Sequence, residues 1–350
     1  MHSYLLAFVS TFIFLWFLIP FSHHIGLVDK PEGRKQHKGS VPLIGGVAMF
    51  LGFTLAVLTL SALPDDIRSF LFASIVLVII GVLDDRHEIS VRSKFLVQLF
   101  AALVMTSTAG HVIYNMGDLF GEGDIMLGGW GIPFTAFIVI GVTNALNMSD
   151  GIDGLAGGVS LISFASMFYL AVDANRIADS QILLLFISIL IPFLLLNAPF
   201  SGKRPATVFM GDAGSMFLGF GLAWYITSLS QGEAAAMSPV IALWIFAIPL
   251  LDTVSIMIRR MTKGQSPFCP DRDHFHHIFQ AAGYSNRKTL FIIVLAQTLL
   301  AAIGIIGHKT GTPDWIMFWG FFVLQVLFFW ALKRAWYVMR VLKQIGGGAA

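Results

Sequence analysis

The sequence has little charge and almost no cysteine. Only 12% of its 350 residues are charged, against about a quarter in soluble domains, whereas 56% are apolar and the mean hydropathy is +0.79. The single cysteine, Cys269, excludes a disulfide framework within the chain. A formal net charge of +2 is too small to suggest nucleic-acid binding. The composition therefore favours an integral membrane protein.

Long apolar runs account for this composition. The first run, from Tyr4 to Pro20, has no basic segment before it and no small-residue cleavage site after it, so we interpret it as an uncleaved span. Runs of spanning length are expected at about 3–22, 43–62, 68–84, 94–110, 130–148, 155–173, 180–198, 212–229, 237–258, 289–307 and 313–332. No internal repeat accompanies them, which disfavours a transporter built from inverted repeats. The sequence predicts an all-α polytopic membrane protein with about eleven transmembrane helices.

The basic residues are distributed unevenly between the loops. All of the 22 Lys and Arg residues except Arg68, Arg176 and Lys309 fall in alternate loops. This set comprises 23–42, 84–94, 149–154, 199–211, 259–288 and the C-terminal tail. Because cytoplasmic loops are enriched in Lys and Arg, we expect this set to be cytoplasmic, with the N-terminus periplasmic and the C-terminus cytoplasmic.

This pattern also predicts how the chain is organised. We expect residues 1–333 to form one transmembrane catalytic domain, and residues 334–350 to form a basic cytoplasmic tail on anionic lipid. The active-site loops of this domain are predicted at 23–42, 84–94, 147–154, 199–212 and 259–288. Because these loops share one membrane face, their ionisable residues are not placed near the midplane, as those of a transporter would be.

Asp84 and Asp85 stand side by side at the end of the third run. Adjacent carboxylates repel each other, so their pKa values depend on a nearby cation. A metal, phosphate chemistry or a basic neighbour such as Lys94 would explain the pair, and a solvated helix end is the simpler alternative.

Asn147, Asp150 and Asp153 recur every three residues, and a helix would place them on one face. An ionisable group at bilayer depth costs about 2.5–3.5 kcal/mol on insertion scales. A capped turn between two spans would explain one acid but not the spaced trio, so we predict a functional site here.

Two further aspartates lie in or beside apolar runs. Asp212 begins the eighth run, where it is either a helix N-cap or a ligand of Mg²⁺, which takes one or two carboxylates together with substrate phosphates. Asp252 lies inside the ninth run, and we favour a structural interhelical contact over a supporting role in the site.

The loop before the tenth run combines Arg272 with His274, His276 and His277. Arginine offers a bidentate fork to phosphate or sugar hydroxyls, and histidine donates to phosphate near neutral pH. A zinc site that uses Cys269 is disfavoured, because such sites need paired Cys and His spacings. Lys38 lies in the first basic loop. It either belongs only to the excess of basic residues that marks cytoplasmic loops or contacts a phosphate.

Six blocks carry a family resemblance that covers nearly the whole chain. They read VDKP at 28–31, PLIGG at 42–46, LDD at 83–85, NMSDGIDG at 147–154, FMGDAGS at 209–215 and SPFCPDRDHFHH at 266–277. In this order they resemble the polyprenyl-phosphate N-acetylhexosamine-1-phosphate transferases of glycosyltransferase family 4. One departure is Glu88, where the family often has a third aspartate. The CDP-alcohol phosphotransferases are disfavoured, because their Asp-Gly-x-x-Ala-Arg motif is not matched after Asp150.

The resemblance implies a reaction and its partners. GlcNAc-1-phosphate would pass from UDP-GlcNAc to undecaprenyl phosphate, giving undecaprenyl-diphosphate-GlcNAc and UMP, as a first membrane step of O-antigen or common-antigen type glycan synthesis. The enzyme would lie in the bacterial inner membrane, use Mg²⁺ or Mn²⁺, and bind no nucleic acid. A homodimer is left open.

The resemblance also implies roles for individual residues. The implied catalytic residues are the acids that handle the lipid phosphate, Asp84 and Asp85, and the acids at the nucleotide, Asp150 and Asp153. The implied metal ligands are Asp212 and Asn147. The implied substrate-binding residues are Lys38, Asn147, Arg272, His274, His276 and His277.

Overall fold

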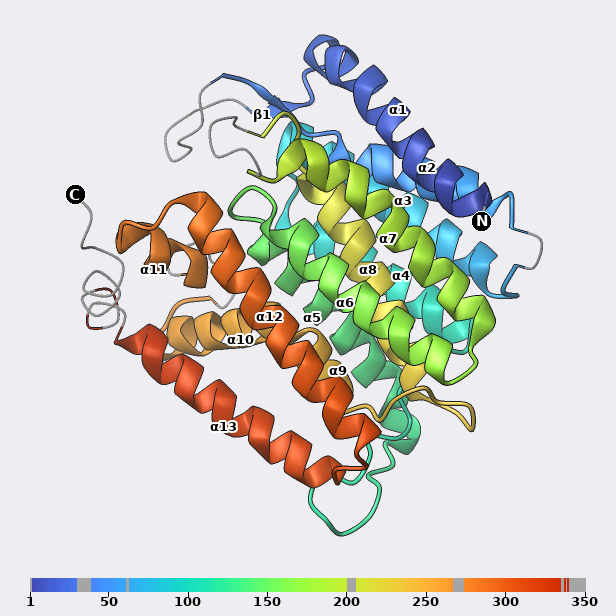
Figure 1. Cartoon of the computed structure of the whole chain (residues 1–350), viewed down its shortest axis with the longest axis vertical. Helices are drawn as coiled ribbons and strands as arrows, with labels where there is room; N and C mark the ends of the chain where they lie inside the picture. The colour runs from blue at the N-terminus through green and yellow to red at the C-terminus, as the bar shows by residue number, and fades with distance from the viewer. Residues whose placement is uncertain are drawn as a thin grey trace.

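The computed structural model of the chain describes residues 2–29, 39–60, 63–199, 206–266 and 274–334, with Tyr337 and Met339. The predicted site residues Lys38 and Arg272, and most of the predicted tail, lie outside these ranges. The helices are α1 His2–Ile25, α2 Gly45–Val57, α3 Ile67–His87, α4 Val91–Thr108, η1 Gly128–Trp130, α5 Gly131–Ser149, α6 Leu155–Asp173, α7 Ile177–Asn197, α8 Gly211–Ser230, α9 Ile241–Ile245, α10 Ala247–Thr262, α11 Phe275–Ala281, α12 Asn286–Lys309 and α13 Asp314–Lys333 (Figure 1).

A single small sheet interrupts this helical architecture within the described residues. Strands β1, Val28–Asp29, and β2, Val41–Pro42, pair antiparallel with Val28 opposite Pro42. The segment that precedes α8 bonds to β2, because the Phe209 amide donates to the Pro42 carbonyl at 2.8 Å. The sheet therefore lies beside the start of α8.

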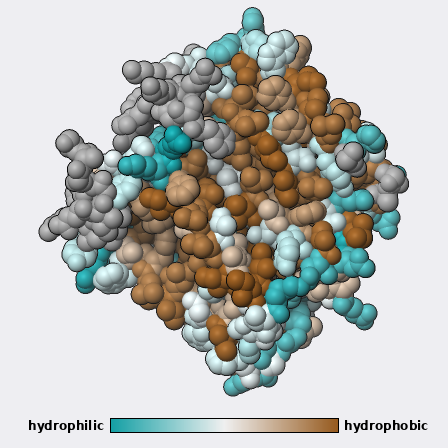
Figure 2. Space-filling view, viewed as in Figure 1, coloured by the Kyte–Doolittle hydropathy of each residue, from teal (hydrophilic) through white to brown (hydrophobic). Residues whose placement is uncertain are grey.

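Within the described residues every predicted apolar run contains helix, which confirms the prediction of a nearly all-α fold. Seven helices in the described part of the chain are long and apolar enough to cross a membrane, namely α1, α3, α5 with η1, α6, α7, α12 and α13. The chain is thus a multi-pass membrane protein. Figure 2 shows apolar residues across the middle of the visible face and hydrophilic residues toward its edges. The count of eleven spans and the direction of the termini stay predictions.

The ninth run does not form one continuous helix. It is divided at Phe246 into α9 and α10, and Pro249 lies in the first turn of α10. The buried Gln297 side chain of α12 spans the break by accepting from the Ile248 amide at 2.9 Å and donating to the Ile245 carbonyl at 2.6 Å. Because the run is broken here, α10 can run in a different direction from α12, as Figure 1 shows. Gln297 therefore satisfies backbone groups that a continuous helix would have paired.

Helix α8 forms the centre of the bundle. Every residue of α8 except Asp212 is buried, as expected for a helix that is covered on all sides. Its aromatic residues pack on those of α2, α3 and α7. Phe217 lies 5.5 Å from Phe53 and 5.4 Å from Phe186, and Phe220 stacks on Phe70 at 5.5 Å, measured between ring centroids. This core fixes α8, and with it the position of Asp212.

Glycines bring α2 and α3 into backbone contact with the start of α8. A Cβ atom on Gly81 of α3 would lie 2.3 Å from the Ala213 Cα atom, and one on Gly46 of α2 would lie 2.1 Å from the Gly214 nitrogen. No side chain fits into these contacts, because real Cβ atoms do not approach backbone so closely. The two glycines thus hold α3 and α2 directly against the turn that carries Asp212.

We expect Gly81→Ala to lower both stability and activity. The new methyl group must push α3 away from α8, and overpacking of this kind costs about 1–3 kcal/mol. The apparent melting temperature in detergent and the rate of product release would measure the two effects. Gly141→Ala on α5 is the matched control, since a Cβ atom there meets nothing within 4 Å. A Gly81→Ala protein as stable and active as Gly141→Ala would contradict the assigned contact.

The described parts of the first five loops of the basic set gather at one end of the bundle, which we call the site end. Here α3, α5 and α7 finish and α6, α8 and α12 begin. The opposite end carries polar contacts of its own, namely His111 with Asp66, Arg176 with Asp179 and Lys309 with Asp173. The alternation of loops that the sequence indicated is therefore found in the fold.

Candidate active site

A cleft of about 1000 Å³ opens at the site end. Its wall is mainly polar and comes from segments far apart in the sequence. The lining residues are Val28, Asp29, Leu43, Asp84, Asp85, Glu88, Asn147, Asp150, Gly151, Ile152, Asp153, Asn197, Phe209, Gly211, Asp212, His277, Gln280, Ala281 and Asn286.

The structure brings most of the predicted site residues into this cleft. Those that line it are Asp84, Asp85, Asn147, Asp150, Asp153, Asp212 and His277. His274 and His276 are buried behind the wall, while Lys38 and Arg272 lie outside the described residues. Acids from several loops therefore meet in one cleft, as the sequence predicted.

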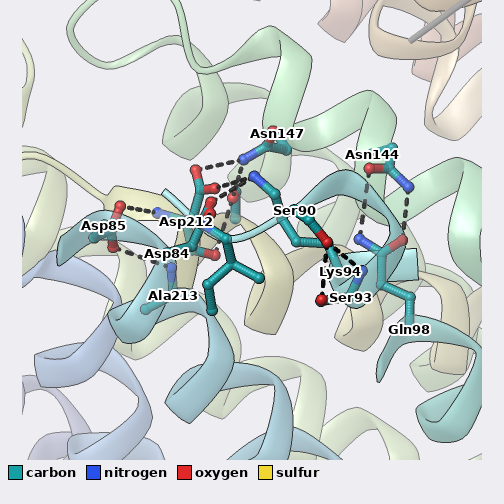
Figure 3. Close-up of polar contacts among 12 residues, drawn as sticks. Asp84, Asp85, Ser90, Ser93, Lys94, Gln98, Asn144, Asn147, Asp212 and Ala213 are labelled. Carbon is teal, nitrogen blue, oxygen red and sulfur yellow. Dashed lines mark hydrogen bonds and ion pairs between the residues drawn. The ribbon is translucent and has the colours of Figure 1, made fainter. Parts of the chain in front are cut away.

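Lys94 joins two of these acids. Its Nζ atom lies 2.5 Å from Asp84 Oδ2 and 3.1 Å from Asp212 Oδ2 (Figure 3). The lysine reaches them because Glu88 ends α3 in a left-handed conformation, with φ +50°, and Ser90 caps α4 immediately afterwards. Lys94 is therefore the basic neighbour that the sequence suggested for the adjacent acids, and it contacts Asp84 of the pair.

Asp84 and Asp85 point in different directions. The Asp84 carboxylate also accepts from the Ile89 amide at 2.7 Å. The Asp85 carboxylate instead accepts from the amides of Asp212, at 2.9 Å, and Ala213, at 3.4 Å (Figure 3). Asp85 thus satisfies free amides at the start of α8, where a negative charge also complements the helix dipole.

Gly211 makes room for this cap. Its φ of +70° lies in the left-handed region, and a Cβ atom there would lie 2.5 Å from Asp85 Oδ2. The Met-Gly-Asp sequence therefore presents its aspartate in a fixed orientation. The sequence suggested that Asp212 itself could be an N-cap, but no side-chain cap by a residue of α8 is found and Asp85 serves that end of the helix.

Asn147 completes the surroundings of Asp212. Its Nδ2 atom donates to Asp212 Oδ1 at 2.8 Å and to Ser215 Oγ at 2.9 Å. One turn earlier on α5, Asn144 donates to Gln98 of α4 at 2.7 Å (Figure 3). This amide pair ties the helix that carries Asn147 to the helix that carries Lys94.

Asn147, Asp150 and Asp153 do not share one helical face, so that expectation is wrong. Helix α5 ends at Ser149, and Asp150 and Asp153 lie in the following turn. The turn arises because Gly154 adopts φ +83° before α6 begins. Asn197 secures it from α7, accepting from the Gly154 amide at 2.7 Å and donating to the Val208 carbonyl at 2.8 Å. All three predicted residues nevertheless reach the cleft.

The charge of Asp150 depends on this crowded turn. The pKa of Asp150 is raised to about 7. Burial by the surrounding protein is the largest cause, and the negative charges of Asp212 and Asp153 add to it. The residue is nevertheless exposed along the cleft, and water there offsets part of the rise. A bound cation would act in the opposite direction and favour the carboxylate.

The three histidines have different positions. His276 is buried and neutral, because burial and then the charges of His277 and His274 lower its pKa to about 3. Its ring lies against Gly151, where a Cβ atom would come within 2.2 Å of Nε2. His277 faces the cleft and its Nδ1 atom lies 2.9 Å from Gln280 Oε1. His274 contacts Asp252, so Asp252 makes an interhelical contact, as predicted, but with the histidine segment.

Some cleft residues were missed at the sequence level. Asn197 was detectable, since it is a lone amide at the end of an otherwise apolar run. Asp29, Gln280 and Asn286 carry no such signal, because each lies among other polar residues in a loop or at a helix end.

The donor set is compatible with Mg²⁺. In the described part of the chain, no three His, Cys, Asp or Glu side chains are grouped so that they alone could hold a metal. Mg²⁺ commonly takes one or two carboxylates and completes its shell with water and substrate phosphates. Asp212, flanked by the amide of Asn147, offers oxygen atoms of this kind at the cleft. An anionic substrate in a cleft with seven lining acids also needs cations to offset the repulsion.

The chain is similar to known proteins over nearly its whole length. Residues 67–230 match the model of glycosyl transferase family 4. The chain is 41% identical over 96% of its length to an undecaprenyl-phosphate alpha-N-acetylglucosaminyl 1-phosphate transferase of Yersinia pestis, covering 92% of that protein. Proteins of the same name from Escherichia coli K12 and Haemophilus influenzae are each 39% identical, over 97% and 99% of this chain and 92% and 97% of their own. The chain therefore belongs to glycosyl transferase family 4, as one of its phosphotransferase enzymes.

Proposed function

We propose that the chain transfers GlcNAc-1-phosphate from UDP-GlcNAc to undecaprenyl phosphate and releases UMP. The observation that carries this proposal is the acid-lined cleft at one end of an apolar helical bundle. There a lipid phosphate held in the membrane can meet a water-soluble nucleotide sugar. The names of the relatives support the acceptor and the transferred group.

The reaction requires positioning more than acid–base chemistry. An oxygen of the lipid phosphate attacks the β-phosphorus of UDP-GlcNAc, and the bond from this phosphorus to the oxygen bridging to the α-phosphate breaks as UMP leaves. A phosphate monoester has a second pKa of about 6, so the attacking oxygen is already ionised near neutral pH. Asp84 then orients Lys94, and Lys94 offsets negative charge at the phosphates.

Asp212 and Asn147 would hold Mg²⁺, with Mn²⁺ as the alternative. When bound, the ion supplies charge neutralisation at the diphosphate. Asp85 fixes Asp212 by capping α8, while the turn with Asp150 and Asp153 faces the nucleotide. Lys38 and Arg272, outside the described residues, are proposed to supply further positive charge, together with His277.

We also propose the cellular setting from the loop charges. The site end faces the cytoplasm, the bundle crosses the bacterial inner membrane about eleven times, and the product feeds O-antigen or common-antigen type glycans.

UMP release by the purified protein tests the function. With undecaprenyl phosphate and Mg²⁺, we expect UMP from UDP-GlcNAc and at least about tenfold less from UDP-glucose, because a missing substrate amide leaves a polar partner unpaired. UDP-GalNAc tests the epimer, and a chelator should abolish release. No UMP from any of these donors would sink the assignment.

A further inference from the structure

Asp252 is a buried carboxylate that lies outside the cleft. It belongs to α10 and is only 5% exposed. Both of its oxygens have partners on the histidine segment, since Oδ1 accepts from the Phe275 amide at 3.0 Å and Oδ2 lies 2.9 Å from His274 Nδ1. Such a carboxylate is costly to bury unless both oxygens are paired. The contact therefore constrains where α11 begins.

Helix α11 depends on such contacts for its position. It has only seven residues, and a helix this short is not stable by itself. Asp252 caps its start, where a negative charge complements the helix dipole. On another side the Phe275 ring packs 4.9 Å from the Phe328 ring of α13. Contacts with α10 and α13 therefore help to place α11, in addition to its packing against α12.

The opposite face of α11 forms part of the cleft wall. His277 and Gln280 line the cleft together with Asn286. The three side chains form a chain of hydrogen bonds, with His277 Nδ1 at 2.9 Å from Gln280 Oε1 and Gln280 Nε2 donating to Asn286 Oδ1 at 2.9 Å. Because Gln280 accepts from Nδ1, the Nε2 atom of His277 is left as the polar atom available to a ligand.

The histidine stack connects this helix to the acidic turn. The His274 and His276 rings lie nearly parallel, with centroids 5.8 Å apart and an interplanar angle of 8°. His276 in turn lies against Gly151, between Asp150 and Asp153. Moving His274 away from Asp252 would thus displace both α11 and the turn that it supports.

We infer that Asp252 is a positioning residue for the nucleotide-sugar side of the cleft. It acts through α11, by holding His277 and Gln280 against the turn of Asp150 and Asp153. This inference rests on the proposed function. Asp252 bonds to His274 and Phe275 and not to Asp84 or Lys94, so we expect its removal to leave the lipid-phosphate side of the cleft unchanged.

The position of Asp252 is itself well fixed. Gln297 bridges the break just before it, and Gln325 of α13 donates to Ser255, one turn further along α10, at 2.8 Å. Ser255 faces α13 and has no bond to α11 in the described residues. Ser255→Ala therefore removes a buried hydrogen bond from the same helix without releasing α11, which makes it a matched control.

Steady-state kinetics with both substrates test the inference. In Asp252→Ala, we expect the KM for UDP-GlcNAc to rise about tenfold, since a lost hydrogen bond to a charged group is worth that order, while the KM for undecaprenyl phosphate stays unchanged. Asp252→Asn keeps an acceptor for the Phe275 amide and should raise the donor KM about threefold. This milder variant also decides the question if Asp252→Ala does not fold. Ser255→Ala should match the wild type in both constants.

A double variant tests whether Asp252 acts through α11. Combined with His277→Ala, Asp252→Ala should raise the donor KM less than about twofold further, because coupled residues are not additive. A wild-type donor KM in both Asp252 variants would overturn the inference, as would an equal rise of both KM values or full additivity with His277→Ala. The proposed function fails separately, if the wild-type protein releases no UMP.

Discussion

Replacing Asp212 by asparagine is expected to lower UMP release about a thousandfold, equivalent to about 4 kcal/mol of transition-state stabilisation. The variant keeps the size of the side chain and its place on the buried α8. It loses the charge that faces Lys94 at 3.1 Å and the carboxylate proposed to hold Mg²⁺. Both losses act on the diphosphate, where negative charge must be offset during transfer. Initial rates at saturating substrates, with Mg²⁺ and Mn²⁺ titrated separately, measure the effect.

Asp173→Asn provides the control for this variant. Asp173 also pairs with a lysine, Lys309, but at the opposite end of the bundle, where the pair is exposed. Surface ion pairs of this kind contribute about 0–1 kcal/mol, so its activity should match the wild type. An Asp212→Asn enzyme that retains more than about a tenth of wild-type activity would remove Asp212 from the central role that we assign to it.

The helical segments and the gathering of the acids could be predicted from sequence, because each depends on a local property. Apolar runs such as 180–198 must become helices in a membrane, since every backbone amide needs an internal partner. Loops that alternate along the chain must also alternate between ends of the bundle. This places the acids near residues 84, 150 and 212 together without any knowledge of packing.

The internal geometry of the site depends on tertiary contacts that sequence spacing does not contain. The spacing of Asn147, Asp150 and Asp153 fits a helix, but Gly154 turns the chain after Ser149. The division of the ninth run requires Gln297 from another helix to satisfy the freed backbone groups. Neither feature has a counterpart in hydropathy or residue spacing.

Adjacency in sequence is equally uninformative about the roles of two acids. Asp84 and Asp85 form one motif in the chain, but their side chains leave α3 in different directions. One contacts a lysine in the cleft, while the other caps α8 and has its oxygens occupied by backbone amides. A division of labour between them follows from the packing of α3 against α8, which Gly81 permits.

The second large effect is expected at Lys94, where Lys94→Met should lower the turnover rate by about 10²–10³-fold. The ammonium group contacts Asp84 and Asp212 at once, and its removal leaves two carboxylates facing each other and the substrate phosphates. Asp84 is 8% exposed and would lose a charged partner, which costs about 1–3 kcal/mol of stability. Turnover and apparent melting temperature are the two measurements.

Further variants separate the structural part of this effect from the catalytic part. Adding Asp84→Asn to Lys94→Met removes one of the repelling charges, so the melting temperature should recover while the activity does not. Arg92→Met deletes the same charge two residues earlier on α4, at an exposed position, and should leave turnover within about twofold, because a solvent-exposed charge is well screened. If Lys94→Met turned over within about fivefold of the wild type, Lys94 would be a structural link between α3, α4 and α8, and the charge that offsets the transferred phosphate would have to come from another residue.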